Sequence, residues 1–285
     1  QKVVRPEPPK IRDPWARTPI DAFILEALQA KALRPSPDED RLPLLRRVTL
    51  DVTGLPPTPR EAAVFLNDRQ PGAYERLVDR LMASPRYGER WALRWLDVAR
   101  YADTNGFEHD LERTQAWRYR DYVVRSFNAD KPYDVFLKEQ IAGDELWPGK
   151  QDALVALGFH RAGPEHLTGG NQDVEQNRQE VLVEMTAGVS NVFLGLTMNC
   201  ARCHNHKFDP ILQTDYYRLQ AIFGGTEGKE VPLATAEEKA RYEAAHKAYE
   251  ERLKPVKDAI AAIEKPYKEA ILAERRAALE PAVRA

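Results

Sequence analysis

The chain contains only two cysteines among its 285 residues, and none of its apolar runs approaches the roughly 18 residues of a transmembrane helix. Two cysteines cannot build a disulfide framework, so local chemistry has to account for the pair. The formal net charge is only −2, which lacks the basic excess of nucleic-acid-binding proteins. With 43% hydrophobic and 30% charged residues, the composition is typical of a soluble globular protein.

A sustained alternation of polar and apolar residues, the pattern of half-buried strands, is also missing. Ser or Thr followed by Pro and often an acid instead marks helix starts at Thr18, Ser36, Thr58 and Ser84. In the helix after Ser84, we expect Trp91, Trp95 and Val98 to form one buried stripe. Further helical patterns run over residues 114 to 128, 133 to 142, 151 to 160 and 174 to 199. The sequence therefore predicts an all-α fold made of many irregularly arranged helices.

The C-terminal segment differs because Ala, Glu, Lys and Arg dominate it. Its apolar residues alternate at spacings of four and three, as in a coiled coil: Tyr249, Leu253, Val256, Ile260, Ile263 and Tyr267. Pro255 and Pro266 each remove a backbone donor, which predicts two or three kinked or broken helices. We expect three parts: an extended segment 1–14, an all-α domain 15–230, and a helical arm 231–285. The arm resembles one half of a helical hairpin and is expected to lead to a further domain.

Both cysteines lie in the stretch NCARCHNHKFDP, residues 199–210. Two thiols separated by two residues and followed directly by histidine form the pattern of covalent c-type haem attachment. In that chemistry the thiols add to the two vinyl groups of the porphyrin, and the adjacent histidine binds the iron. Cys200 and Cys203 are the expected thioether anchors and His204 is the expected axial ligand.

Other chemistries use similar clusters. A zinc site could take Cys200, Cys203 and either His204 or His206, with His160, His166 or a carboxylate completing the set. A thioredoxin-like dithiol needs a βαβ context, which the helical pattern does not provide. Two structural cysteines are the simplest alternative, but such residues usually lie in apolar surroundings, and CARCHNHK is strongly polar. The motif therefore favours haem first and zinc second.

The run CARCHNHKFDPILQTDYYRLQAIF resembles the signature of the planctomycete-type cytochrome-like family, also described as domain of unknown function 1549. PIDAFILEAL, RRVTLDVTGLPPTPREAAVFL, YERLVDRLMASPRYGERWALRWLDVARYADTNGFEHD, YRDYVVRSFNADKPYDVFLKEQIAGDEL and LGFHR are similar to the same family. The resemblance covers roughly residues 15 to 225. It implies an exported bacterial protein with one covalent haem c, in which a helical insert and a second domain of unknown function follow. It implies no established reaction.

The ligand on the second face of the iron determines what a haem can do. His160 is the first candidate for this distal ligand because it ends an apolar helix before a glycine-containing loop. Met185 is the second candidate, and His166 and His109 follow. His206 is too near His204 to reach the other face, so we expect it to hydrogen-bond behind the ligand. His246 lies on a solvated helix and is expected to have no role.

The turn RYADTNGFEHD gathers polar side chains after the aromatic helix. Such turns often only terminate helices. As a functional element, this one would form a polar wall above the haem or a substrate, with Arg100 paired to a propionate or an anionic ligand.

Three hypotheses for the function follow. The first is a periplasmic c-type cytochrome domain with one covalent haem that carries electrons within a larger oxidoreductase. The second is a haem enzyme, peroxidase-like or acting on carbohydrate, with an open iron. The third is a zinc-stabilised helical binding module. Expected partners are a redox protein or further domains of the same polypeptide. Gln1 begins no signal-peptide pattern, so export would require a signal that precedes this numbering.

Overall fold

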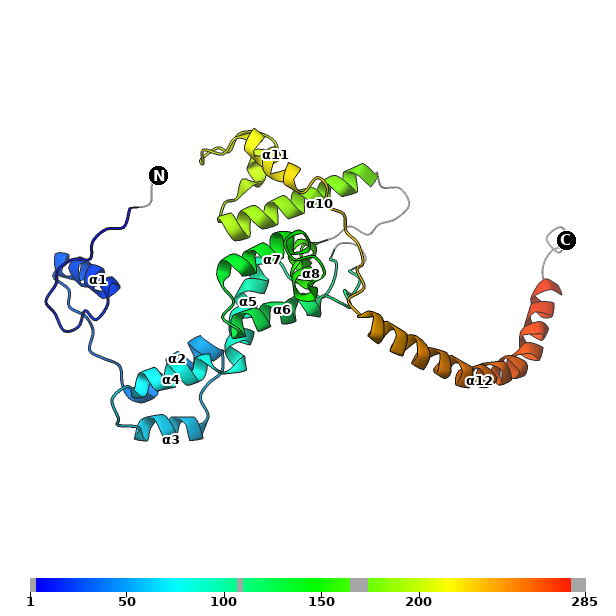
Figure 1. Ribbon diagram of the computed structural model, residues 1–285, viewed down its shortest axis with the longest axis horizontal. Coiled ribbons are helices and arrows are strands. Elements are labelled where there is room, and N and C mark those ends of the chain that lie inside the picture. Colours follow the sequence, from blue (N-terminus) through cyan, green and yellow to red (C-terminus); the bar gives the residue numbers. More distant parts are fainter. Residues whose placement is uncertain (1–3, 107–109, 165–173, 278–285) are drawn as a thin grey trace. The chain divides into compact units, whose positions relative to one another are not determined.

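The computed structural model describes residues 4–106, 110–164 and 174–277, and over these residues the protein is all-α (Figure 1). A single isolated bridge, Thr104 with Glu112, is the only β pairing found there. The chain divides into two compact units, residues 1–225 and 226–285. The first unit contains every helix up to α11, and the second contains α12 alone.

The predicted cap signals form the starts of three helices, α1 (Pro19–Ala30), α3 (Pro59–Asn67) and α5 (Pro85–Val98). Thr18 and Thr58 each form a capping box with the acid three residues later, and Ser84 accepts the amide of Arg86 at 3.3 Å. The signal at Ser36 was misleading. The next helix, α2 (Arg41–Thr53), begins after Asp40, and residues 34–40 lack helical structure.

Helices α2, α3 and α4 (Ala73–Met82) share a small core. Leu45, Phe65 and Leu77 are at most 3% exposed within it. The Arg41 guanidinium covers the ring of Phe65, 4.2 Å from its centroid, and also donates to the Asp68 carbonyl at 2.9 Å. This core packs next to α5, which connects it to the main part of the unit.

The main core is built from α5, α6 (Trp117–Asn128), α7 (Tyr133–Leu146), α8 (Gln151–Ala156), α9 (Gly158–Arg161) and α10 (Val174–Val189). The buried stripe of α5 consists of Gly88, Ala92 and Leu96, whereas Trp91 and Val98 are exposed and Trp95 is half-buried. The predicted tryptophan stripe was therefore wrong in part. Gly88 lets Asn128 of α6 approach α5 closely, Trp95 packs on Phe136 with ring centroids 4.8 Å apart, and Trp91 lies on the exposed side.

Two polar side chains of α7 are completely buried in this core. The Gln140 side-chain oxygen accepts hydrogen bonds from Tyr119 Oη at 2.6 Å and from Trp95 Nε1 at 2.9 Å. Glu139 accepts from Tyr122 Oη at 2.8 Å, and it forms ion pairs with Lys131 and Lys150. Because these groups are paired, their burial is tolerated.

After α10 the chain forms a π-helical turn, η1 (Ser190–Leu194), that ends at Gly195 in the left-handed region, with φ 63°. A 3₁₀ helix, η2 (Met198–Arg202), and α11 (Gln213–Ile222) follow. Figure 1 shows α10 and α11 next to each other, and the two helices are in contact. The cysteine motif therefore lies between two helices that pack together.

The second unit is one continuous helix, α12 (Ala236–Ala277), with Pro255 and Pro266 inside it. From the two prolines we expected two or three kinked or broken helices, and the structure has one helix that continues past both. A proline removes one backbone hydrogen bond and bends a helix, and neighbouring turns can continue past it. Figure 1 shows the resulting curved course. The predicted coiled-coil residues are exposed on this helix, apart from Leu253, which is half-buried.

Candidate functional site

The two cysteines lie on one 3₁₀ turn, Cys200 within η2 and Cys203 directly after it. A 3₁₀ helix has three residues per turn, so side chains three positions apart point in the same direction. Both thiols are free and both residues are exposed. The sequence spacing and the local helix type together present the two sulfur atoms on one side of the turn.

His204 follows this turn and is exposed. Its Nδ1 lies 2.7 Å from the carbonyl oxygen of Asn205. A carbonyl can only accept, so Nδ1 is the donor in this contact, and in the neutral tautomer the lone pair then lies on Nε2. A backbone carbonyl that fixes the ring in this way is the usual arrangement behind a metal-binding histidine.

His206 closes the loop that leads from the motif to α11. Its side chain is 8% exposed, and its Nδ1 accepts the backbone N–H of Asp209 at 2.9 Å. Its own backbone N–H donates to the Ile211 carbonyl at 2.9 Å. These hydrogen bonds go to the backbone of the loop itself, so the expected role of His206 behind the iron ligand stays a prediction.

Side chains of helix α11 bind the backbone of the motif turn. The Arg202 carbonyl accepts hydrogen bonds from Gln213 Nε2 at 3.1 Å and from Tyr217 Oη at 3.0 Å. The backbone N–H of Gln213 donates to the side-chain oxygen of Asn205 at 2.9 Å. The Arg202 guanidinium forms an ion pair with Glu180 of α10, at 3.2 Å. The residues between and after the two cysteines are therefore anchored to both neighbouring helices.

A small apolar core lies beneath the same turn. Met198 and Ala201 pack there against Tyr216 of α11, with Ile211 and Leu219 at the edge. Tyr216 is fully buried, and its hydroxyl has no hydrogen-bond partner among the residues that the structure describes. Burial raises the pKa of this hydroxyl, so it stays protonated at neutral pH.

Arg100 is half-buried and already has a partner. Its guanidinium is paired with the Glu184 carboxylate of α10, and its Nη1 also lies 3.4 Å from the Glu184 carbonyl. The side chain passes close to Gly188, where a Cβ atom would lie 2.5 Å from Nη2, and at Gly163 a Cβ atom would lie 2.8 Å from the paired Glu184 carboxylate. Pairing of Arg100 with a propionate stays a prediction, and it would have to compete with Glu184.

His160 lies at a kink of α7. Ala142 has non-helical angles, φ −149° and ψ 43°, and the neighbouring Ile141 carbonyl lies 3.1 Å from His160 Nε2. Burial lowers the pKa of His160, so the ring is neutral at pH 7, and Nε2 must carry the proton that the carbonyl accepts. The other ring nitrogen, Nδ1, is enclosed and has no partner among the described residues.

His160 and the motif contact opposite ends of α11. The imidazole packs on Phe223, with ring centroids 5.4 Å apart, whereas Arg202 is held by Gln213 and Tyr217. Tyr217 and Phe223 are six positions apart, which corresponds to about 9 Å along a helix. Iron ligation by His160 stays a prediction. With Nε2 bonded to Ile141, the ligating atom would be Nδ1, which the fold encloses.

The remaining candidates lie elsewhere. Met185 is 3% exposed in the aromatic core and is not among the residues beneath the motif. His166 and His109 lie outside the described residues. His246 stacks on Tyr242 of α12, with ring centroids 5.6 Å apart.

Sequence reasoning missed the role of Arg113, which organises the polar turn after α5. Its Nε bonds to the side-chain oxygen of Asn105, and its Nη2 donates to the Gly163 carbonyl at 2.7 Å. Tyr101 donates to Asp103 at 2.6 Å within the same turn. The spacing of Asn105 and Arg113 carried no recognisable signal, because the contact depends on how residues 162–163 return to this turn.

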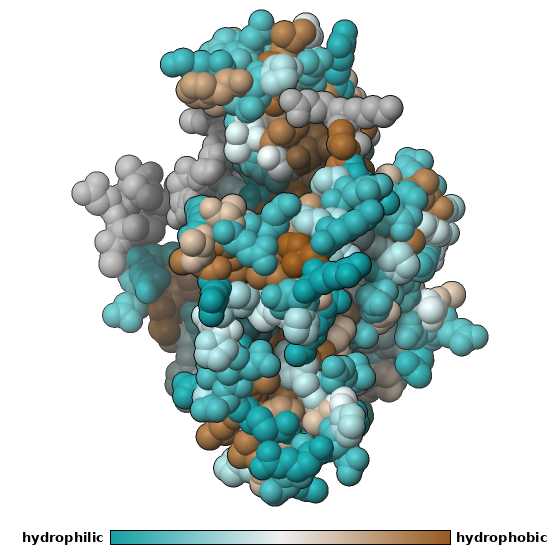
Figure 2. Space-filling model, turned by 90° about the vertical axis from the view of Figure 1, so that its left-hand side faces the viewer, coloured by the Kyte–Doolittle hydropathy of each residue, from teal (hydrophilic) through white to brown (hydrophobic). Residues whose placement is uncertain are grey.

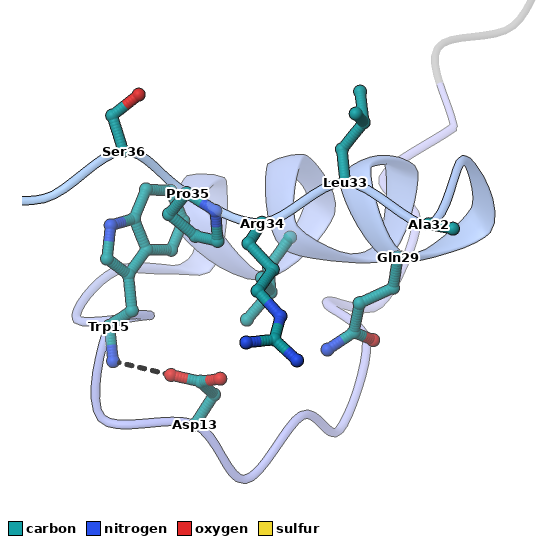
Figure 3. A pocket seen from close by; sticks show the side chains of 9 residues that line it. Asp13, Trp15, Gln29, Ala32, Leu33, Arg34, Pro35 and Ser36 are labelled. Carbon is teal, nitrogen blue, oxygen red and sulfur yellow. Dashed lines mark hydrogen bonds between the residues drawn. The ribbon is translucent and has the colours of Figure 1, made fainter.

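A cavity of about 730 Å³ lies beside α1, far from the motif in sequence (Figure 3). Arg34 and Gln29 point toward the loop in which Asp13 accepts the Trp15 backbone N–H at 2.8 Å. None of the predicted site residues lines this cavity. The surface in Figure 2 shows apolar side chains in separate patches between hydrophilic ones.

In the described ranges, no three His, Cys, Asp or Glu side chains are grouped so that they could hold a metal ion. Among those same ranges, no helix combines the length and apolar character needed to cross a membrane. The site is thus an exposed dithiol–histidine turn supported by a helical scaffold.

Comparison with known proteins assigns this all-α domain to a family. The sequence model of the PSCyt2 family, described as protein of unknown function DUF1549, matches residues 19–228. The chain belongs to this family. No curated protein and no solved structure matches it.

Proposed function

We propose that the chain is a c-type haem domain that carries electrons within a larger exported oxidoreductase. Cys200 and Cys203 would hold the haem through two thioether bonds, and His204 would bind its iron. The observation that carries this proposal is the state of His204, whose Nδ1–H donates to Asn205 while Nε2 stays free beside two exposed thiols. That combination suits covalent attachment and axial ligation together.

The protein's own residues would position the group. Gln213 and Tyr217 fix the Arg202 carbonyl, so the turn that carries both thiols keeps its shape. Asn205 links His204 to α11, because its carbonyl accepts from the imidazole and its side chain accepts from Gln213. The bound haem would supply one iron centre that exchanges single electrons.

The expected compartment and partners follow from this chemistry. Thioether attachment takes place outside the cytoplasm, so the mature protein would be periplasmic or otherwise exported. A domain with one haem needs a donor and an acceptor of electrons, which we assign to a redox protein or to further domains of the same polypeptide.

The decisive experiment is expression of the full chain in a host with c-type maturation, followed by a pyridine haemochrome spectrum and metal analysis. One covalent haem per chain is expected. Cys200→Ala and Cys203→Ala should lose covalent haem, whereas His246→Ala, an exposed histidine on α12, should retain it. One zinc per chain without haem would contradict the proposal and favour a zinc-stabilised binding module.

A haem enzyme is the second candidate, and the positions of His160 and Met185 favour it. His160 Nε2 bonds to Ile141 and its Nδ1 is enclosed, and Met185 is enclosed in the core, so neither side chain faces the exposed turn. An iron without a second strong ligand permits peroxide or gas chemistry. Prompt spectral changes with carbon monoxide or cyanide in the wild type would support this candidate. If such changes appear only in His160→Ala, the distal ligand is His160 and electron transfer is favoured.

A further inference from the structure

Helix α12 exposes an apolar stripe along most of its length. Within the part of the chain that the structure describes, none of its 42 residues is buried. The apolar residues of the stripe recur at spacings of four and three, and they are at least 50% exposed apart from Leu253, which is half-buried. We call this stripe the seam, and it consists of Tyr242, His246, Tyr249, Leu253, Val256, Ile260, Ile263 and Tyr267.

A helix of this composition needs a partner that covers the seam. Helices in water gain most of their stability from packing an apolar face, and α12 has no buried face of its own. Pro255 and Pro266 weaken it further, because an interior proline removes a backbone hydrogen bond and is the least favourable residue in a helix. A contiguous exposed apolar surface of this kind marks an interaction site.

The seam has the register of a coiled coil. If Leu253 takes position a of the heptad, every residue of the seam falls at position a or d. Pro255 then takes position c on the outer face, and Pro266 takes position g at the edge. Neither proline ring therefore stands between α12 and a helix that packs along the seam.

The order of residues in the seam is self-complementary when two copies run antiparallel. A two-fold axis makes every contact occur twice, and each position a then meets a position d of the second copy. If Leu253 meets Val256 of the second copy, the whole seam pairs with itself. Pro255 lies at the centre of this arrangement, so both helices bend at the same level. The other layers are Ile260 with Tyr249, Tyr267 with Tyr242, and His246 with Ile263.

Charges at the centre of the seam favour the antiparallel orientation. Glu250 and Lys257 both take position e, and they are bonded to each other at 3.1 Å along one edge of α12. Two antiparallel helices bring their e edges together, which places Glu250 of one copy opposite Lys257 of the other, twice. A parallel pair brings position g to position e, which would place Arg252 against Lys257 of the second copy.

The ends of the same edge are less favourable but already compensated. Glu243 of one copy would face Glu264 of the other in the antiparallel pair. Each of these carboxylates has a lysine on its own helix, since Glu243 pairs with Lys239 at 3.9 Å and Glu264 pairs with Lys268 at 2.6 Å. Exposed ion pairs contribute little to stability, so they select the orientation and the apolar seam supplies the affinity.

The contact is large enough for a stable dimer. Covering the exposed part of each seam residue removes roughly 100 Å² per position and roughly 800 Å² per helix, about the area that each partner buries in a standard interface. Acidic and basic residues nearly balance along α12, so its net charge does not oppose pairing with a copy of itself.

We infer that α12 is a dimerisation arm, whose seam pairs with the seam of a second copy of this chain as an antiparallel two-stranded coiled coil. The inference goes beyond the proposed function and does not depend on a haem. Because each first unit precedes Ala236, the first units of the two copies would join the coiled coil at its opposite ends.

The first test measures the mass of the full chain as a function of concentration by analytical ultracentrifugation. A dimer is expected. Ile260→Lys should raise its dissociation constant by roughly 100-fold or more, because each dimer would bury two unpaired ammonium groups. Leu272→Lys is the matched control, since Leu272 is 57% exposed on the same helix but takes position f on the outer face. This control should leave the dissociation constant unchanged.

A second measurement separates loss of pairing from failure to fold. All five tryptophans lie between Trp15 and Trp147, so their fluorescence reports the first unit alone. That fluorescence should be the same in Ile260→Lys and in the wild type. Far-ultraviolet circular dichroism should show less helix in Ile260→Lys, because α12 without its partner loses the packing that supports it.

The third test determines the orientation in a full chain whose native thiols are removed by Cys200→Ser and Cys203→Ser. Chains with Tyr242→Cys are mixed with chains that carry Tyr267→Cys and treated with a mild oxidant, which takes up the two electrons released as a disulfide forms. The antiparallel register predicts a disulfide between the two different chains. Two copies of position 267 would lie about 38 Å apart along the axis, so Tyr267→Cys alone should not cross-link.

Each contrary result has a definite meaning. A full chain that is monomeric at every concentration would overturn the inference, and a helix other than a second copy would then cover the seam. A dimer weakened equally by Ile260→Lys and Leu272→Lys, or by neither, would also overturn it, because the contact would lie elsewhere. Efficient cross-linking of Tyr267→Cys alone would overturn the antiparallel pairing in favour of a parallel one.

Discussion

His160 Nε2 donates a hydrogen bond to the main-chain oxygen of Ile141, and this contact ties α9 to the kink of α7. The carbonyl lies next to Ala142, where the helix departs from regular geometry. The histidine that sequence reasoning placed at the iron is therefore already used by the scaffold. Its effect on stability can be measured separately from any effect on a haem spectrum.

The stability of the first unit should depend on pH through His160. Burial lowers its pKa below the usual 6.5, so the unfolded chain binds this proton at a higher pH than the folded chain does. The contribution is fully present above pH 6.5 and is lost as pH falls toward the folded pKa. Urea unfolding between pH 7.5 and about pH 5 should show this decline. His160→Gln should flatten the decline, and His246→Gln should not. If the unfolding free energy declines equally in both variants as pH falls, the proton responsible binds to a group other than His160.

Glu139 should be essential for folding. Its side chain is 0% exposed and is paired with Lys131 and Lys150. Burial acts to raise the pKa of Glu139, but hydrogen bonds from both lysines and Tyr122 outweigh this and hold it below its usual value. Glu139→Gln should cost about 1.5–3 kcal/mol in urea unfolding, because the buried side chain loses its charge-assisted hydrogen bonds from Lys131 and Lys150. The exposed pair Arg86–Glu89 supplies the control, since Glu89→Gln should cost less than about 1 kcal/mol. Comparable costs for the two variants would contradict this role.

Gly143 should tolerate no side chain. A Cβ atom at this position would lie 2.3 Å from the Ala153 carbonyl oxygen, and backbone cannot move aside cheaply. Gly143→Ala should destabilise the protein by roughly 3 kcal/mol, measured by urea or thermal unfolding. Gly225→Ala is the matched control, because a Cβ atom there would meet no described atom within 4 Å. Wild-type stability of Gly143→Ala would show that α7 and α8 are farther apart than the contact implies.

Both thiols should react in the folded, haem-free protein. Cys200 and Cys203 are free and exposed, so a colorimetric thiol reagent should titrate two groups per chain without denaturant. Haem-loaded protein should show none before or after denaturation, because thioether bonds consume both sulfur atoms. Two reactive thiols in a sample that carries stoichiometric haem would show that the haem is not covalently attached.

The fold class could be predicted from the sequence because it depends on local signals. The capping boxes at Thr18 and Thr58 and the absence of strand alternation involve residues only a few positions apart. Sequence-based predictions were wrong where tertiary packing determines the structure. Ser36-Pro37 has the composition of a helix start, but the helix begins at Arg41. Trp91 of α5 is exposed, and the face buried in the core carries Gly88, Ala92 and Leu96, with Gly88 against Asn128 of α6.

In the candidate site, too, features that depend on local sequence were predictable and features that depend on tertiary contacts were not. The motif of Cys200, Cys203 and His204 was recognisable because its spacing is local. The partners of Arg100 and His160 were not, since Glu184 and Ile141 are distant in sequence and meet them only through tertiary structure. Tyr216 and Gln220 have the spacing of one helical turn, but nothing in the sequence indicates that their polar atoms are enclosed without partners among the described residues.

The π-helical turn at Ser190–Leu194 affects the direction in which the chain runs toward the turn that carries Cys200 and Cys203. A π turn holds one residue more than an α turn, and each residue rotates the chain by about 100° around the helix axis. The π turn therefore changes the side of α10 from which the chain leaves toward Met198, relative to an uninterrupted α-helix. The number of residues in this segment therefore contributes to the direction in which the turn with Cys200 and Cys203 faces, together with the contacts that hold Arg202.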